Sequence, residues 1–252
     1  MLPKNFKPDA NYTLVRLGKD NDGGYLINIE SIKQTKLLLS FGISDDFSFE
    51  NDFKKQNNCP IIAFDPTTSN KFFLKKIIFN FFKFEFRNFL DAIFNFYNFK
   101  KFFNKKENLF VQKKIGEGGS LNYETITFDE ILLLSKVNSN FFLKIDIEGS
   151  EYRILNDLVK NSKLIVGIAI EFHDVDLHLE KISEFIEKID LDLVHIHANN
   201  YSKPGKQGIP TAIELTFARN PIKIGNNLNF PHKLDQKNDP DSKNIDLFFT
   251  EN

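Results

Sequence analysis

Residues 141–155 read FFLKIDIEGSEYRIL, and this stretch decides the fold of the chain. Its apolar start, bounded by asparagine and glycine, is typical of a strand buried on both faces of a parallel sheet. Lys144, Asp146 and Glu148 interrupt the run at alternate positions, so an extended strand would point all three to one side. Either Lys144 forms a structural ion pair with one carboxylate, or the strand ends near Ile147 and its carboxylates enter the crevice where open α/β sheets bind ligands. We favour the crevice.

Further apolar segments have the length of buried strands, and helical patterns separate most of them. They are residues 37–41, 59–64, 109–113, 164–170, 192–196 and 211–218. Strands that alternate with helices predict an α/β domain with a mostly parallel sheet and helices on both faces. Thr127, with Glu130 three residues later, predicts a helix start by the capping-box pattern, and Ser150 is expected to cap the helix that follows the opening stretch.

The first strands end in residues that suit a nucleotide cofactor. Gly42 and Ser44 follow the strand at 37–41 and precede a helix, whose first N–H groups can face a ligand. The dinucleotide fingerprint G-x-G-x-x-G is absent, which counts against a nicotinamide enzyme. Asp65 ends the next strand, about twenty residues after the glycine, where a carboxylate binds ribose hydroxyls. A turn-forming aspartate before proline is the alternative.

A second group of polar residues follows the later strands. Glu171 and His173 share one face at the end of the most hydrophobic strand, at the same edge as Asp146. A histidine in this place is either structural or catalytic, and the pattern does not separate the two. His197 ends the strand at 192–196. Beyond it come Asn199 and a loop marked by glycine and proline that carries Lys203 and Lys206.

The octapeptide KIDIEGSE at 144–151 resembles the signature of the FkbM family of S-adenosylmethionine-dependent methyltransferases. SFGISDDFSFE at 40–50, DGGY at 22–25, TITFDEIL at 125–132 and the tail FPHKLDQKNDPDSKNIDLFF at 230–249 resemble its other motifs. The resemblance implies a class I (Rossmann-like) fold with a seven-stranded sheet and a reversed terminal strand. It also implies S-adenosylmethionine as cofactor, with Ile115 and Gly116 beside the adenine and Gly42, Ser44, Asp65 and Asp146 around the rest.

The family resemblance further implies O-methylation of a hydroxyl on a small molecule or sugar, in surface-polysaccharide synthesis. An alcohol acceptor needs a general base or a metal that lowers the pKa of its hydroxyl. The candidate catalytic groups are Asp146, Glu148, His173 and His197. Asp146, Glu171 and His173 would suit Mg²⁺ or Mn²⁺, whereas a metal-free mechanism would use His173 as base.

The acceptor side of the site is expected on the loop after the strand at 192–196. Lys203 and Lys206, with Asn199, are expected to contact the acceptor and could meet the diphosphate of a nucleotide-activated sugar.

Length and composition bound the remaining expectations. At 252 residues the chain predicts one domain, 1–252, in which residues 1–30 contain a hairpin that acts as a lid. The net charge of −1 gives no global case for nucleic acid. The single cysteine excludes an internal disulfide, and no signal peptide is recognisable, so we expect a cytoplasmic protein.

Residues 71–108 are rich in Phe and Lys without a clean period. We expect two helices packed on the sheet edge with solvated lysines. A homodimer contact or a membrane-surface contact is the alternative use of such a segment, but stable insertion is not expected because no run approaches about 18 apolar residues. The alternative functions are a non-catalytic nucleotide-binding module and a membrane-associated module with the same fold.

Overall fold

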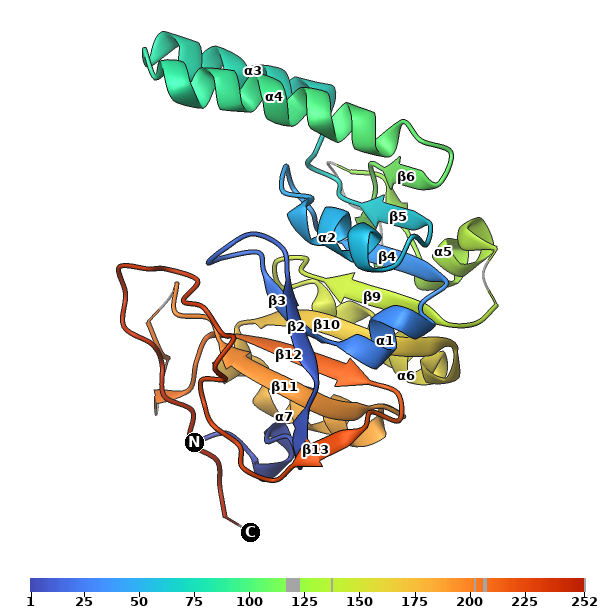
Figure 1. The fold of residues 1–252 in the computed structure, drawn as a ribbon, viewed down its shortest axis with the longest axis vertical. Helices are drawn as coiled ribbons and strands as arrows, with labels where there is room; N and C mark the ends of the chain where they lie inside the picture. The colour runs from blue at the N-terminus through green and yellow to red at the C-terminus, as the bar shows by residue number, and fades with distance from the viewer. Residues whose placement is uncertain (117–122, 137, 202, 206–207, 252) are drawn as a thin grey trace.

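A computed structural model describes residues 1–252 except 117–122, 137, 202, 206–207 and 252 (Figure 1). One sheet contains seven strands in the order β11-β12-β10-β9-β4-β5-β6. They are β4 (Leu37–Phe41), β5 (Ile61–Phe64), β6 (Asn108–Val111), β9 (Phe141–Ile145), β10 (Ile165–His173), β11 (Asp192–Ala198) and β12 (Ala212–Ala218). All neighbours pair in parallel except β12, which is antiparallel to both of its neighbours. The predicted sheet with a reversed terminal strand is confirmed.

Helices cover both faces of this sheet. They are α1 (Ile29–Gln34), α2 (Ser48–Gln56), α3 (Asn70–Phe82), α4 (Phe86–Phe103), α5 (Phe128–Ser135), α6 (Leu155–Lys160) and α7 (Val175–Lys188). Alternate residues of β4 enter two separate cores: Leu39 packs with residues of α5, α6 and α7, whereas Leu38 packs with residues of α1 and α2. This two-sided burial explains why β4 and β9 consist almost entirely of apolar residues.

The predicted N-terminal hairpin is present as β2 (Leu14–Leu17) and β3 (Tyr25–Asn28), paired antiparallel. Arg16 holds its turn, because the guanidinium donates to the carbonyl oxygens of Gly24 at 2.9 Å and Lys19 at 3.2 Å. The hydroxyl of Thr216 on β12 donates to the carbonyl of Leu26 at 2.7 Å, so the hairpin lies against the sheet.

Short elements complete the described chain. The minor strands are β1 (Asn11–Tyr12) with β13 (Lys223–Gly225), and β7 (Lys114–Ile115) with β8 (Thr125–Ile126). Three single 3-10 turns lie at η1 (Lys4–Phe6), η2 (Glu151–Arg153) and η3 (Ser162–Leu164).

The Phe/Lys-rich insertion forms the two expected helices, α3 and α4, which run side by side away from the sheet (Figure 1). The expectation that both pack on the sheet edge is right only for their base, where Phe99 contacts Phe110 on β6. The distal ends protrude, and Phe82, Phe84 and Phe86 are 72, 86 and 71 % exposed. Among the described residues, no helix combines the length and the apolar character that a membrane crossing requires.

Three local expectations meet different outcomes. The capping box is confirmed: Thr127 accepts from the backbone N–H of Glu130, whose carboxylate accepts from the N–H of Thr127. Ser150 makes no capping hydrogen bond, so that expectation was wrong. The strand predicted at 192–196 continues to Ala198, which places His197 inside β11 and not after it.

We expect Thr127→Ala to lower the free energy of unfolding by about 1 kcal/mol, since it removes the hydroxyl that caps α5. Thr127→Ser keeps a hydroxyl and should differ from the wild type by only a few tenths. Urea unfolding followed by circular dichroism measures both. An alanine variant as stable as the serine variant would show that the box does not stabilise the helix.

Candidate active site

A cleft of about 650 Å³ opens where the central parallel strands end. Gly42 and Ser44 follow β4, Asp65 follows β5 and Asp146 follows β9, and all four line it. Other lining residues come from the tip of the N-terminal hairpin: Lys19, Asp22 and Gly23. The hairpin therefore borders the cleft from above the sheet, as a lid would.

Gly42 is required by the close approach of two strand ends. Its φ is +75°, and a Cβ atom on it would lie 1.6 Å from the carbonyl oxygen of Asp146. The N–H of Asp146 donates to the carbonyl of Phe41 at 2.9 Å, which keeps the two chains at that separation. No side chain fits between them, so the floor of the cleft depends on this glycine.

Of the two roles that the sequence left open for Asp65, the structure shows the turn role. Its Oδ1 accepts from the N–H groups of Thr67 at 2.7 Å and Thr68 at 3.0 Å, which is the turn role. Its Oδ2 accepts from the N–H of Ser44 at 2.8 Å and keeps capacity for a further donor. Since Asp65 also lines the cleft, ribose binding by Oδ2 stays a prediction that the geometry allows.

Of the two residues expected beside the adenine, one lines the cleft and the other does not. Ile115, in β7, is 4 % exposed and lines the cleft. Gly116 is not among the lining residues, and its N–H donates to the carbonyl of Ile126 at 3.1 Å. Residues 117–122 lie outside the described part of the chain.

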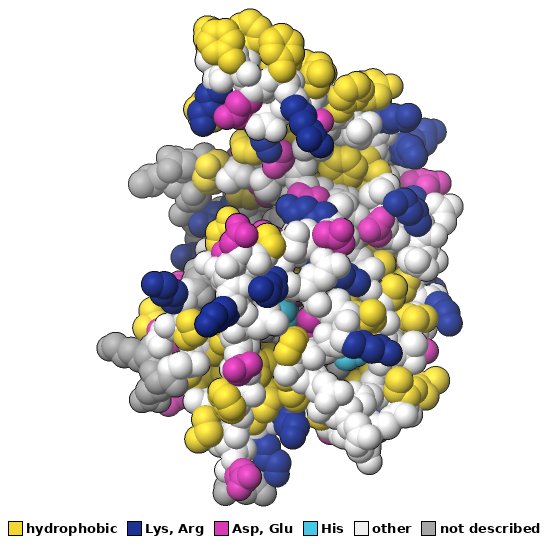
Figure 2. Space-filling model, turned by 60° about the vertical axis from the view of Figure 1, so that its left-hand side comes forward, with side chains coloured by type: hydrophobic (Ala, Val, Ile, Leu, Met, Phe, Trp, Pro, Cys, Tyr) yellow, Lys and Arg dark blue, Asp and Glu magenta, His cyan; other side chains and the backbone are white. Residues whose placement is uncertain are grey.

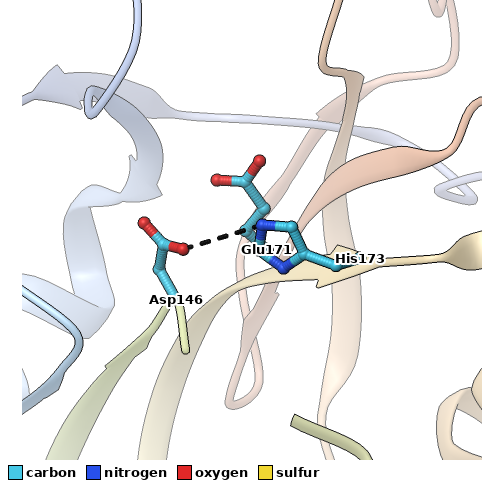
Figure 3. A group of neighbouring side chains, drawn as sticks. All are labelled: Asp146, Glu171 and His173. Atoms are coloured by element: carbon cyan, nitrogen blue, oxygen red, sulfur yellow. Dashed lines mark ion pairs between the residues drawn. The ribbon is translucent and has the colours of Figure 1, made fainter. Parts of the chain in front are cut away.

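Asp146, Glu171 and His173 converge at the ends of β9 and β10 (Figure 3). One ligand atom from each lies within 4.8 Å of the others, and Nε2 of His173 is 4.0 Å from Oδ1 of Asp146. They approach because β9 and β10 are parallel neighbours whose carboxyl ends meet at the same edge. The group fits a divalent cation in its donor types, two carboxylates and one imidazole.

Two further glutamates contact His173. Glu151 is fully buried and its Oε1 lies 3.1 Å from Nδ1 of the ring. Glu148 lies 3.5 Å from Nε2, but β9 ends at Ile145 and a turn with a φ of +52° at Glu148 leaves its side chain 86 % exposed. The sequence predicted for Glu151 only a favourable place at the positive end of a helix. Its contact with the His173 ring depends on the η2 turn, which packs against β10.

Tyr25 is the main site residue that the sequence reasoning missed. Its hydroxyl lies 3.0 Å from Oδ2 of Asp146 and 3.2 Å from Oε2 of Glu171, and the residue is 2 % exposed. The only sequence signal was the DGGY unit, which ends with this tyrosine. The hairpin thus contributes a donor to the site as well as a cover to the cleft.

The structural ion pair considered for Lys144 is also present. Its ammonium group is buried, lies 3.3 Å from Oδ2 of Asp146, and donates to the carbonyl of Gly42 at 2.6 Å. Burial opposes the charge, but Asp146 and Glu50 more than offset it and raise the pKa of Lys144. The two explanations for the opening stretch are therefore compatible.

Burial and neighbouring charges shift the site's titrations. Desolvation, with the charges of Asp146 and Glu214, raises the pKa of Glu171 to about 8. For His173, burial opposes the charged form, but Glu151 and then Glu171 and Asp146 raise the pKa to about 9. The metal-free site therefore holds protons at neutral pH, and a cation would compete with them.

His197, expected to be catalytic, lies in a separate buried cluster. Its Nδ1 is 3.4 Å from Asp235 and its Nε2 is 3.1 Å from Asn238, both in the C-terminal segment. Burial disfavours the charge, but Asp235 and Glu214 raise the pKa of His197 to about 9. Because β11 continues past residue 196, the ring is enclosed and anchors the C-terminal segment; it does not reach the cleft.

Two of the expected substrate residues, Asn199 and Lys203, are not among the residues that line the cleft. Asn199 is 5 % exposed and donates to Oε1 of Glu171 at 2.7 Å, so it supports the site from beneath. Lys203 is exposed on the loop after β11. Lys206 lies outside the described residues.

The strand order, with parallel strands on one side and a single reversed strand inserted near the far edge, is that of a class I methyltransferase. The Methyltransferase FkbM domain matches residues 5–202, and the chain belongs to this family of S-adenosylmethionine-dependent methyltransferases. No curated protein matches the chain.

Solved methyltransferase structures resemble the chain only distantly. A precorrin-6y C5,15-methyltransferase from Geobacter metallireducens is 13 % identical with a TM-score of 0.40, over 76 % of this chain and 84 % of that one. The fibrillarin pre-rRNA processing protein of Methanococcus jannaschii is 10 % identical with a TM-score of 0.38, over 84 % of each chain. At this distance neither says anything about the acceptor.

We expect Tyr25→Phe to lower the free energy of unfolding by about 1–3 kcal/mol, because it leaves the buried carboxylate of Glu171 and the half-buried carboxylate of Asp146 without the tyrosine hydroxyl. Tyr97→Phe, which removes a hydroxyl from a side chain that is 62 % exposed, is the matched control and should be neutral. Equal stabilities of the two variants in urea would mean that the hydroxyl does not support the carboxylates.

Proposed function

We propose that the protein transfers the methyl group of S-adenosylmethionine to a hydroxyl of a sugar, in free or nucleotide-activated form. The observation that carries the proposal is the convergence of Asp146, Glu171 and His173 beside the cleft bordered by Gly42 and Asp65. Proton-accepting and oxygen-binding groups at that position suit an alcohol, which must lose a proton as it is methylated. The family resemblance supports the sugar.

Different residues of the chain would bind the cofactor and act on the acceptor. Ser44, Asp65 and Ile115 would hold the cofactor in the cleft, through a backbone loop, a carboxylate and an apolar surface. The cofactor supplies a methyl group on a positively charged sulfur. The residues around Asp146 would orient the acceptor hydroxyl and remove its proton, since positioning and proton removal are what the chemistry demands of the protein.

A divalent metal, Mg²⁺ or Mn²⁺, fits the donor set of Asp146, Glu171 and His173. It would offset the burial and the neighbouring negative charges that raise the pKa of Glu171, and it would acidify a bound hydroxyl. In the metal-free alternative, His173 takes the proton, which requires a pH at which the ring has lost its own proton, since its pKa is raised to about 9. That alternative is favoured by one observation, the contact of Glu151 with Nδ1, which turns Nε2 toward Asp146.

The cofactor assignment predicts binding of S-adenosylhomocysteine to the purified protein by calorimetry. We expect Asp65→Asn to weaken that binding at least about tenfold, the loss typical of a hydrogen bond to a charged group. Asp129→Asn, at a carboxylate that is 65 % exposed, should bind as the wild type does. No binding by the wild type would refute the assignment of the cleft.

The metal assignment predicts that Mn²⁺ raises the melting temperature and that chelator reverses the rise. Glu171→Gln should abolish the shift, whereas Glu148→Gln, at the exposed carboxylate, should retain it. A wild type that ignores both Mn²⁺ and chelator leaves His173 as the base.

Turnover is tested separately, by release of S-adenosylhomocysteine with a panel of sugars and nucleotide sugars. We expect Asp146→Ala to abolish turnover on any acceptor found, because it removes a group shared by both versions of the mechanism. Near-normal kcat in this variant would place the chemistry elsewhere.

A further inference from the structure

Within the part of the chain that the structure describes, the contacts that anchor the α3–α4 hairpin, residues 70–106, on the main body lie toward its base. There Phe73 packs on Phe99, which also contacts Phe47 and Phe110 of the main body. Asn95 donates to the carbonyl oxygen of Asp45 at 2.8 Å, so the base is also tied to the loop that borders the cofactor cleft. These contacts fix the hairpin's direction relative to the active site.

The distal half makes ring contacts within the hairpin itself, such as those of Phe89 with Phe81 and Phe86. Its outer surface is apolar, and Figure 2 shows hydrophobic side chains gathered at the apex of the molecule. The exposed members are Ile78, Phe79, Phe81, Phe82, Phe84, Phe86, Leu90, Ile93 and Phe94. An apolar surface of this extent on a projecting tip marks an interaction site.

The hairpin is also strongly basic. Residues 70–106 contain eight lysines and one arginine against one glutamate and one aspartate, a net charge of +7. The whole chain carries −1, so the remainder carries −8. The near-neutral total conceals this separation of charge. Lys100 and Lys101 are exposed toward the base, behind the apolar tip, and Lys83 lies over the ring of Phe79 at the tip itself.

An apolar tip followed by basic side chains matches the chemistry of an anionic lipid surface. Apolar side chains enter the boundary between headgroups and acyl chains, while lysines reach the anionic headgroups. The tip of a second copy is a poor partner, because two hairpins of the same charge would repel each other. Nucleic acid would use the lysines but would leave aliphatic residues such as Ile78 and Ile93 without apolar cover.

We propose that the α3–α4 hairpin docks the protein on an anionic membrane surface through its apolar tip. The acidic remainder would be held away from the same surface by its charge.

Flotation of the full chain with vesicles tests this directly. We expect binding to vesicles of phosphatidylcholine mixed with phosphatidylglycerol, weak binding to phosphatidylcholine alone, and loss of binding at high salt. Phe82→Ser combined with Phe84→Ser and Phe86→Ser should weaken binding at least about tenfold. The control combines Leu133→Ser and Leu177→Ser, two residues that are 78 and 74 % exposed on other helices, and should bind normally.

A second variant, Lys100→Glu with Lys101→Glu, keeps the tip and should lose the preference for anionic vesicles. Retained circular dichroism and S-adenosylhomocysteine binding would show that each variant is folded, which separates failure here from failure of the proposed function. Equal vesicle binding by wild type and tip variant would overturn the proposal. The proposal would also be overturned if the wild type formed a dimer that the tip variant does not form, or if the protein bound RNA but no vesicles.

Discussion

The burial of like charges at adjacent strand ends is the constraint on which the rest of the structure depends. Glu171 and Glu214 face each other directly across β10 and β12, and each is about 5 % exposed or less. Desolvation raises the pKa of both. Such carboxylates destabilise a fold unless donors reach them. Here the donors come from distant segments: Tyr25 and Asn199 to Glu171, and Asn238 to Glu214.

That requirement explains why both ends of the chain fold over the same edge of the sheet. The N-terminal hairpin brings Tyr25 over the carboxylates and, with its tip, borders the cofactor cleft. The C-terminal segment brings Asn238 and Asp235 to His197, which lies opposite Glu214 on β11. The site and the closure of the fold therefore use the same polar groups. A change to one of them is expected to affect stability and chemistry together.

The cleft connects the carboxylate–histidine group with the projecting α3–α4 hairpin, because it shares one bordering residue with each of them. Asp45 borders the cleft and accepts a hydrogen bond from Asn95 in the hairpin. Asp146 borders the cleft and belongs to the metal-type group with Glu171 and His173. A methyl donor in the cleft, an acceptor near Asp146 and a surface held by the hairpin tip would thus keep a constant arrangement, because the cleft is bordered both by Asp146 and by Asp45, which contacts the hairpin.

The sequence by itself determined the strand alternation and the residues that end β4, β5, β9 and β10, because buried strands must be apolar and polar residues at their ends stand out. The reversed terminal strand was implied by the family resemblance and not by this pattern. The sequence left the partners of those residues undetermined. Glu151, Tyr25 and Asn199 reach the site through turns whose path depends on tertiary packing. His197 was placed after its strand and not inside it, because the alternation of side chains along a strand does not show at which residue the strand ends. The exposure of the hairpin tip was likewise decided only by the tertiary structure, since phenylalanine in a helix has the same pattern whether or not another element covers it.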